Sequence, residues 1–204
     1  MSTERDAWVR SVAVASWLSV SFFVSPPIAA QGAKNLTPEL QRAREALDKY
    51  RDPVVAVHDG YWSTVGCVSY PKPGGAGDVP SYKPGGMGVH FVNFGLLGKP
   101  LDPLKPQILV YEPVGEKLQL VAAEWFVPIS PEVKERPRLF GQPFDGPMAG
   151  HHPLQPKALN HYDLHVWLWK DNPHGMFAPT NPGVKCPKGP YTLEESAPRV
   201  LPHK

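Results

Sequence analysis

The segment that runs from His161 to Trp169 (HYDLHVWLW) carries the residue types best suited to chemistry in this chain. If it forms a β-strand, alternate side chains point to one face, so two imidazoles and a carboxylate project side by side from His161, Asp163 and His165. Histidines also gather here, since five of the eight in the chain lie within residues 151–174. Neutral imidazole together with carboxylate suits first-row transition metals. The pattern therefore predicts a site for Zn, Cu or Fe.

Two residues from other segments are predicted to complete this site. His90 lies in an alternating segment, 88–93, that follows a glycine-rich approach. Glu124 would share a strand face with four apolar residues, and a carboxylate buried there needs a paired group or a cation. The alternative for Glu124 is that a bulge turns it to solvent. The alternative for Asp163 is that it orients a histidine ring instead of binding the metal itself.

His151 and His152 are secondary metal-ligand candidates, in a proline-rich loop that also carries Met148. A methionine with two histidines would suit copper. More often, such a loop only covers the edge of a core. In the main predicted site, His90, His161 and His165 would supply three nitrogen ligands, and Glu124 or Asp163 would supply one oxygen. This set would leave an open position on the metal, which is typical of catalytic sites.

Two metal-free functions are the alternatives, and the first of them would use the same histidines and carboxylates. In an acid–base enzyme, a histidine and a carboxylate would exchange protons, although the sequence has no G-x-S-x-G nucleophile motif. In a binding or structural module, tryptophans and prolines would line a pocket for a small-molecule ligand or a partner. Phosphate-binding glycine loops, zinc-finger spacings and haem attachment motifs are all absent from the sequence.

The elements that must position these residues begin with a helical segment. Thr37 is a typical N-cap and Pro38 suits the first helical position, after which apolar residues recur at helical spacing. Asp52 and Pro53 repeat this signal, and Gly60 can end the second helix in a left-handed conformation. We therefore expect a helix with a break, packed on the following elements through one apolar stripe.

Strands are predicted to follow the helical segment, over residues 88–93, 107–112, 117–127 and 161–169. Turn residues at 113–116 make the second and third of these a hairpin. In its second strand, period-two alternation places five residues on one face: Leu118, Leu120, Ala122, Glu124 and Phe126.

Long segments rich in proline and glycine separate these strands, and residues 68–87 are predicted to form a loop. The two cysteines, Cys67 and Cys186, are predicted to form a disulfide. Thiolate ligation of copper is the alternative, but both cysteines are far from the histidine cluster in sequence. The predicted fold class is α+β, with an N-terminal helical segment packed on a mainly antiparallel β-sheet, long Pro/Gly-rich loops and one disulfide.

Residues 1–30 have the pattern of a secretory signal peptide, with a short basic region, an apolar run over 11–24 and small residues up to Ala30. The apolar run is shorter than the roughly 20 residues that span a bilayer, so we expect cleavage and no stable membrane anchor. Residues 31–204 would then form a single secreted or periplasmic domain. The net charge of +2 and the scattered basic residues do not favour a nucleic-acid partner.

Three strings give the chain a distinctive signature: GMGVHFVN, FDGPMAGHHP and HYDLHVWLWKDNPHG. In these strings it resembles a family of secreted bacterial proteins to which no activity is assigned. The resemblance extends over nearly all of the segment that follows the signal peptide. It implies export from a bacterial cell, and it adds no catalytic residue to those derived above.

Overall fold

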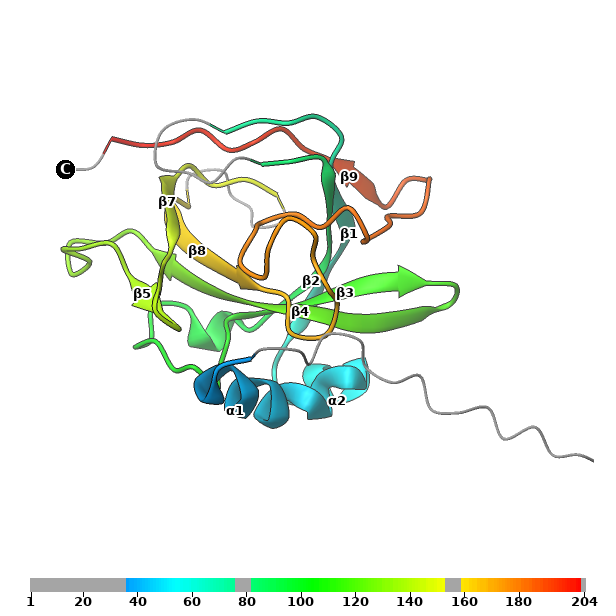
Figure 1. Ribbon diagram of the computed structural model, residues 1–204, viewed down its shortest axis with the longest axis horizontal. Coiled ribbons are helices and arrows are strands. Elements are labelled where there is room, and N and C mark those ends of the chain that lie inside the picture. The colour runs from blue at the N-terminus through cyan, green and yellow to red at the C-terminus, as the bar shows by residue number, and fades with distance from the viewer. Residues whose placement is uncertain (1–35, 76–81, 153–158, 203–204) are drawn as a thin grey trace, which may run out of the picture.

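A computed structural model describes residues 36–75, 82–152 and 159–202, and the predicted signal peptide lies outside the described residues. Within them the chain has an α+β fold, in which a short N-terminal helical segment packs on a curled, mainly antiparallel sheet (Figure 1). The predicted fold class is thereby confirmed.

The helical elements are α1 (Pro38–Leu47), the 3₁₀ turn η1 (Asp48–Arg51), α2 (Pro53–His58) and a later 3₁₀ turn, η2 (Phe94–Leu96). The strands are β1 (Trp62–Tyr70), β2 (Gly85–Val92), β3 (Ile108–Val114), β4 (Lys117–Pro128), β5 (Arg138–Leu139), β6 (Gln142–Pro143), β7 (Asp145–Met148), β8 (His161–Val166) and β9 (Thr192–Glu194).

Local capping chemistry explains where the helices begin and end. The Thr37 hydroxyl accepts a hydrogen bond from the Leu40 amide at 3.3 Å, and Asp52 caps α2 in the same way, as the sequence predicts. Gly60 has a φ of 92°, which only glycine adopts without strain. The helical segment therefore breaks and ends at the predicted residues.

The described strands form a seven-stranded sheet in the order β7-β8-β4-β3-β2-β1-β9, with β5 and β6 paired separately. Neighbouring strands are antiparallel except for β1 and β9, which are parallel. The predicted hairpin is present as β3 and β4, and the histidine-rich segment forms β8 between β4 and the edge strand β7. The strand predicted over 161–169 is too long, because β8 ends at Val166 and residues 167–169 lie beyond it. The candidate ligands therefore lie on interior strands.

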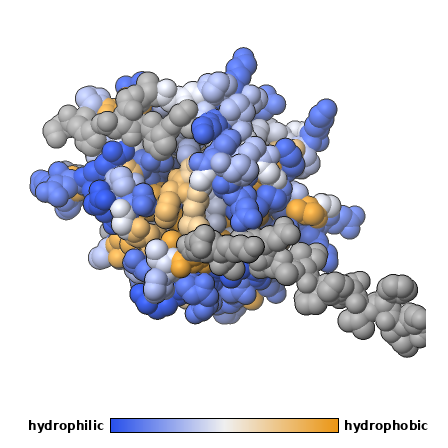
Figure 2. Space-filling view, viewed as in Figure 1, coloured by the Kyte–Doolittle hydropathy of each residue, from blue (hydrophilic) through white to orange (hydrophobic). Residues whose placement is uncertain are grey.

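The two faces of the sheet bury different residues. One face packs against α1 and η1 and is apolar, with Leu109, Tyr111 and Trp125 beneath Leu40 and Leu47. In the space-filling view, the outer side of the helices at the lower edge of the molecule is mostly hydrophilic, as expected for one inward apolar stripe (Figure 2). The opposite face combines a smaller apolar cluster with most of the buried polar side chains.

A β-bulge in β4 corrects the predicted face assignment. Val110 pairs with Ala122, and Tyr111 pairs with Leu120, so Val121 is the extra residue. Downstream of the bulge, Ala122, Glu124 and Phe126 share the polar face as predicted. Upstream of it the prediction is wrong, because Leu118 and Leu120 pack on the helical side instead.

The predicted loop over 68–87 is also partly wrong. Its first residues end β1 and its last residues begin β2, where Ser69 pairs with Gly86 and Tyr70 with Gly85. These ends are ordered by burial, because Val68, Tyr70, Tyr82 and Met87 form an apolar cluster of their own. Residues 76–81 lie outside the described part of the chain.

Cys67 on β1 forms the predicted disulfide with Cys186, 119 residues further along the chain. A disulfide is typical of proteins outside the cytoplasm. On the chain-entropy model, closing a loop of about this length stabilises the fold by roughly 5 kcal/mol. None of the helices in the described residues is both long enough and apolar enough to cross a membrane.

Candidate metal centre

The first of two buried groups, which we name cluster A, consists of His90, Glu124 and His165. Each comes from a different strand: β2, β4 and β8. Glu124 lies directly opposite His165 in the β4–β8 register. His90 reaches the same region from β2, since its partner Val110 pairs in turn with Ala122, two residues before Glu124. The candidate ligand atoms of cluster A all lie within 4.8 Å of one another.

Polar atoms in cluster A are close together but lack aligned hydrogen bonds. Glu124 Oε2 is 3.2 Å from His165 Nε2 and 3.5 Å from His90 Nε2, and the three side chains are at most 5% exposed. Both nitrogens of each ring and Glu124 Oε2 have no hydrogen-bond partner among the described residues. An unsatisfied buried polar group costs about 1–3 kcal/mol. The geometry therefore favours an occupant that can satisfy these atoms together.

Burial and the Glu124 charge act in opposite directions on the two rings of cluster A. For His90 burial dominates, and its pKa falls to about 4. Burial also lowers the pKa of His165, but Glu124 and then Asp163 more than offset it and raise that pKa to about 9. Without a metal ion, His165 therefore holds a proton and His90 does not. A metal ion would displace that proton, because imidazole binds metals in its neutral form.

The second group, cluster B, consists of His151, His161 and Asp163. The latter two come from β8, and His151 follows β7. His161 Nε2 is 3.5 Å from Asp163 Oδ2, and the two imidazole rings have their centroids 5.1 Å apart. The His161 ring also stacks on Phe126 at 4.4 Å. As in cluster A, the candidate ligand atoms lie within 4.8 Å of one another.

Backbone carbonyls set the orientation of both rings in cluster B. His161 Nδ1 is 3.0 Å from the Leu159 carbonyl oxygen, and His151 Nδ1 is 2.8 Å from the His152 carbonyl oxygen. A carbonyl oxygen can only accept, so Nδ1 carries the hydrogen in each ring, and a neutral ring then has its lone pair on Nε2. Metal-binding histidines commonly donate their other N–H in this way. Both rings thus have Nε2 available as a ligand.

The Asp163 carboxylate is ionised despite complete burial. Burial raises its pKa, but the hydrogen-bonding contact with His161 and the charge of His165 outweigh that effect and lower it. Asp163 Oδ1 has no hydrogen-bond partner among the described residues. Cluster B therefore also combines two nitrogens with a negatively charged oxygen.

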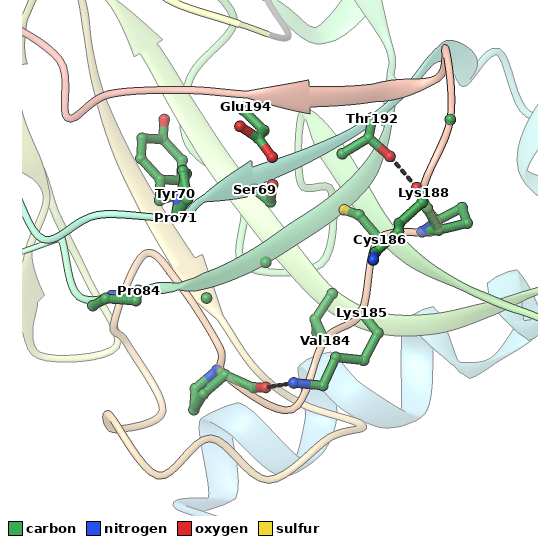
Figure 3. Close-up of a pocket in the computed structure, with 15 residues that line it drawn as sticks. Ser69, Tyr70, Pro71, Pro84, Val184, Lys185, Cys186, Lys188, Thr192 and Glu194 are labelled. Carbon is green, nitrogen blue, oxygen red and sulfur yellow. Dashed lines mark hydrogen bonds between the residues drawn. The ribbon is translucent and has the colours of Figure 1, made fainter.

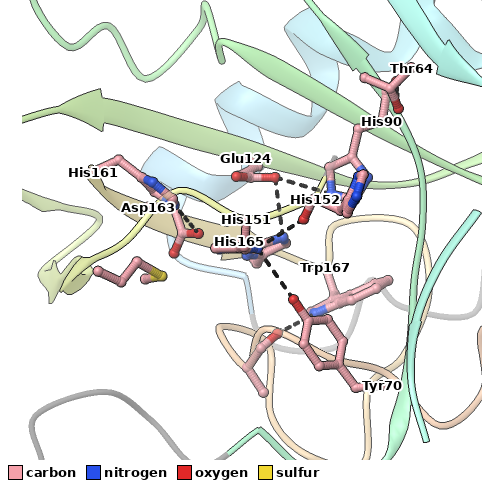
Figure 4. Close-up of polar contacts among 12 residues, drawn as sticks. Thr64, Tyr70, His90, Glu124, His151, His152, His161, Asp163, His165 and Trp167 are labelled. Carbon is pink, nitrogen blue, oxygen red and sulfur yellow. Dashed lines mark hydrogen bonds and ion pairs between the residues drawn. The ribbon is translucent and has the colours of Figure 1, made fainter. Parts of the chain in front are cut away.

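A small cavity lies between the two clusters. Its walls include His90 and Glu124 from cluster A, His151 and His161 from cluster B, and also Met87, Phe126 and His152. Figure 4 shows the side chains of both clusters converging on this region from β2, β4 and β8. About 10 Å³ of the cavity is open to the centre of a water-sized sphere, which is near the minimum that one water needs. The cavity therefore fits a metal ion or one water, and it is too small for an organic substrate.

The structure places the predicted site residues in two neighbouring groups rather than in one ligand set, because His161 groups with Asp163 and His151 while His165 groups with His90 and Glu124. Clusters A and B contain His90, Glu124, His161, Asp163 and His165, together with the secondary candidate His151. Glu124 is not turned to solvent, because the bulge precedes it and leaves it 4% exposed. His152 borders the cavity, but its Nε2 lies 3.7 Å from Glu195 Oε1. The role of these residues as ligands remains a prediction.

Sequence reasoning missed three neighbours of the site. Asp145 on β7 lies opposite Asp163; burial and the Asp163 charge raise its pKa to about 8, so it is mainly neutral at pH 7. The Tyr70 hydroxyl is 3.4 Å from His151 Nδ1, and Met87 lines the cavity. No local pattern could have found them, because each is brought to the site by strand pairing or loop packing.

No protein-family model, curated protein or solved structure matches this chain. Two buried His/carboxylate groups on the sheet can hold a metal ion.

A larger, open groove of about 600 Å³ lies away from the clusters, beside the disulfide (Figure 3). Two of its polar side chains have partners: Lys185 Nζ donates to the Pro182 carbonyl at 2.7 Å, and the Thr192 hydroxyl donates to the Pro187 carbonyl. Proline and glycine residues form much of its wall. Among the described residues that line it there is no histidine, so the groove lacks the imidazole and carboxylate set that distinguishes the clusters.

Three tryptophans on or just after the strands serve as packing residues, whereas Trp62 on β1 is 62% exposed. Trp125, Trp167 and Trp169 are at most 5% exposed, and their indole N–H groups donate at 2.8, 2.7 and 3.0 Å to Asp102, Ala178 and Asp48. The sulfur of Met148 similarly accepts from the Tyr82 hydroxyl at 3.8 Å. These contacts account for the burial of all four side chains without a ligand.

Proposed function

We propose that this is a secreted metal-binding protein in which His90, Glu124 and His165 hold a first-row transition-metal ion. The observation that carries the proposal is the convergence in cluster A of five buried atoms that lack an aligned hydrogen bond among the described residues, with one carboxylate oxygen between two imidazole rings. One cation bound between the carboxylate and the two imidazoles would satisfy atoms from all three residues. A single proton can satisfy only one pair of them.

The donor set supports zinc, iron or copper as the ion. Two imidazole nitrogens and a carboxylate oxygen are borderline ligands that these metals share. Sulfur donors from cysteine are excluded, because Cys67 and Cys186 form the disulfide. Three protein ligands leave at least one open position, as in catalytic zinc sites, and here the adjoining cavity has room for about one water.

Export supports metal loading outside the cytoplasm. The disulfide favours an oxidising compartment, and the signal-like segment over 1–30 is consistent with it.

The test is elemental analysis by mass spectrometry of protein purified from the exported fraction without chelators or an affinity tag. Near-stoichiometric zinc, iron or copper is expected in the wild type. Glu124→Gln and His90→Gln, which keep the side chains close in size, should each lose metal at cluster A. His58→Gln is the matched control, because the His58 side chain is 87% exposed at the end of α2.

Circular dichroism and thermal unfolding of each variant separate loss of metal from loss of fold. If Glu124→Gln and His90→Gln fold and still bind as much metal as His58→Gln, the assignment of cluster A is wrong. If the wild type binds no metal even after reconstitution, cluster A is a buried imidazolium–carboxylate network, and the metal-free functions become the better explanation.

A further inference from the structure

We propose that cluster B binds a second metal ion beside the first, so that the two clusters form one two-metal centre. This inference rests on the proposed function of cluster A and extends it. Its basis is the close approach of one candidate ligand atom each from His151, His161 and Asp163, which a single proton cannot satisfy together.

The contact between His161 and Asp163 is the first step. His161 Nδ1 donates to the Leu159 carbonyl, so in the neutral ring Nε2 is an acceptor. That acceptor is 3.5 Å from a carboxylate oxygen, Asp163 Oδ2, with both side chains at most 2% exposed. Two acceptors facing each other in a buried site repel each other unless a proton or a cation lies between them.

His151 decides between these two occupants. Its Nδ1 donates to the His152 carbonyl, and its Nε2 is buried without a hydrogen-bond partner among the described residues. A proton on His161 would pair with Asp163 and leave His151 Nε2 unsatisfied. A metal ion can accept the lone pairs of both rings and the carboxylate at once, because the candidate atoms lie within 4.8 Å of one another.

The spacing of the two ligand sets along β8 places this second ion close to the first, on opposite sides of the small cavity. Residues of both clusters line it, and the two sets are offset by one pleat along β8, because Asp163 and His165 are two residues apart. Two residues of a strand span about 6.7 Å. Ions held by the two sets are thus expected within about that distance, and two-metal sites have ions about 3.5–4 Å apart.

Each cluster supplies one carboxylate to this region, from Glu124 or from Asp163. Asp145 adds a third buried carboxyl group opposite Asp163, and this group is mainly neutral at pH 7, so it is not counted as a charge that balances the ions. Asp145 Oδ2 has no hydrogen-bond partner among the described residues. Asp145 faces Asp163 from the neighbouring strand β7. It is not proposed as a ligand.

The first part of the test measures stoichiometry. Metal-free protein is titrated with Zn²⁺, dialysed and measured by elemental analysis, for the wild type and for Glu124→Gln, Asp163→Asn, His161→Gln and the control His58→Gln. We expect two ions in the wild type and in the control. One ion should remain in each cluster A or cluster B variant, and none in Glu124→Gln combined with Asp163→Asn.

The second part measures proximity. In protein loaded with Cu²⁺, electron paramagnetic resonance should show dipolar broadening and a half-field transition from two nearby ions. Both signals should disappear in Asp163→Asn and in His161→Gln, leaving the spectrum of an isolated ion.

The outcomes separate this inference from the proposed function. One zinc ion in the wild type that is lost in Glu124→Gln and kept in the cluster B variants overturns the second site and leaves cluster A standing. One ion that is lost in both sets of variants overturns the two-metal centre in favour of a single mixed site. Two ions without magnetic coupling overturn the shared centre, and no ion at all overturns both proposals.

Discussion

The buried pair of Glu124 and His165 allows a quantitative test of charge in cluster A. The perturbation is a double-mutant cycle in metal-free protein, with His165→Leu, Glu124→Leu and both together. Leucine is apolar and similar in volume to either side chain. The wild-type pair is 3.2 Å apart, and the two side chains are 0% and 5% exposed.

The three variants should differ widely in their free energy of unfolding. His165→Leu leaves the Glu124 charge buried beside His90, whose pKa of about 4 keeps that ring neutral at pH 7. Breaking a buried pair in this way costs about 3–5 kcal/mol. Glu124→Leu should cost less, about 1–3 kcal/mol, because His165 can lose its proton and become an unsatisfied neutral ring. The double variant should be close to wild type, since apolar replacement of a buried pair is often neutral or stabilising.

Urea denaturation at pH 7 with a chelator present, followed by circular dichroism, measures all four corners of the cycle. With these costs, and with a double variant close to wild type, a coupling energy of at least about 4 kcal/mol is expected. If His165→Leu is no less stable than the double variant, Glu124 is not a buried, uncompensated charge, and the reasoning is refuted.

Three further predictions concern stability. In metal-free protein the pKa of His165 is raised from 6.5 to about 9. The stability that its proton contributes is therefore complete below about pH 6.5 and is lost as pH rises towards 9. The urea midpoint of the wild type should fall over this pH range, and an equal fall for His165→Leu would contradict the assignment of the raised pKa to His165. Replacing Cys67 and Cys186 by alanine should lower the free energy of unfolding by roughly 2–5 kcal/mol, and an unchanged thermal midpoint in non-reducing buffer would show that the bridge is not stabilising. Gly88→Ala should destabilise the fold more than Gly98→Ala, although both glycines have a positive φ. A Cβ at Gly88 would lie 2.6 Å from the Tyr111 carbonyl oxygen, whereas a Cβ at Gly98 would have nothing within 4 Å. Equal thermal midpoints for the two variants would contradict the close approach of β2 and β3.

Local signals in the sequence predicted many of the helices, turns and strands that position the site. The caps at Thr37 and Asp52 depend on neighbouring residues alone, as does the turn between β3 and β4. The period-two pattern of β8 likewise placed His161, Asp163 and His165 on one face before any strand pairing was known, because strand geometry fixes that alternation.

Features that depend on pairing between distant strands could not be predicted. The extra residue Val121 becomes a bulge only through its register with β3, so the face of Leu118 and Leu120 was assigned wrongly. β7 carries Asp145 to the edge of the sheet from a segment in which proline and glycine suggested only a loop. The convergence of His151 on β8 likewise depends on tertiary packing, which no spacing rule encodes.

X-ray absorption spectroscopy of the protein loaded with Zn²⁺ tests the central claim most directly, because it reports the atoms bound to the metal. We expect a first shell of nitrogen and oxygen at about 2.0–2.2 Å with outer-shell scattering from imidazole rings. In Glu124→Gln combined with His90→Gln, imidazole scattering from cluster A should be lost. A sulfur shell near 2.3 Å, or a shell of oxygen without imidazole scattering, would contradict the claim that these histidines and carboxylates hold the metal.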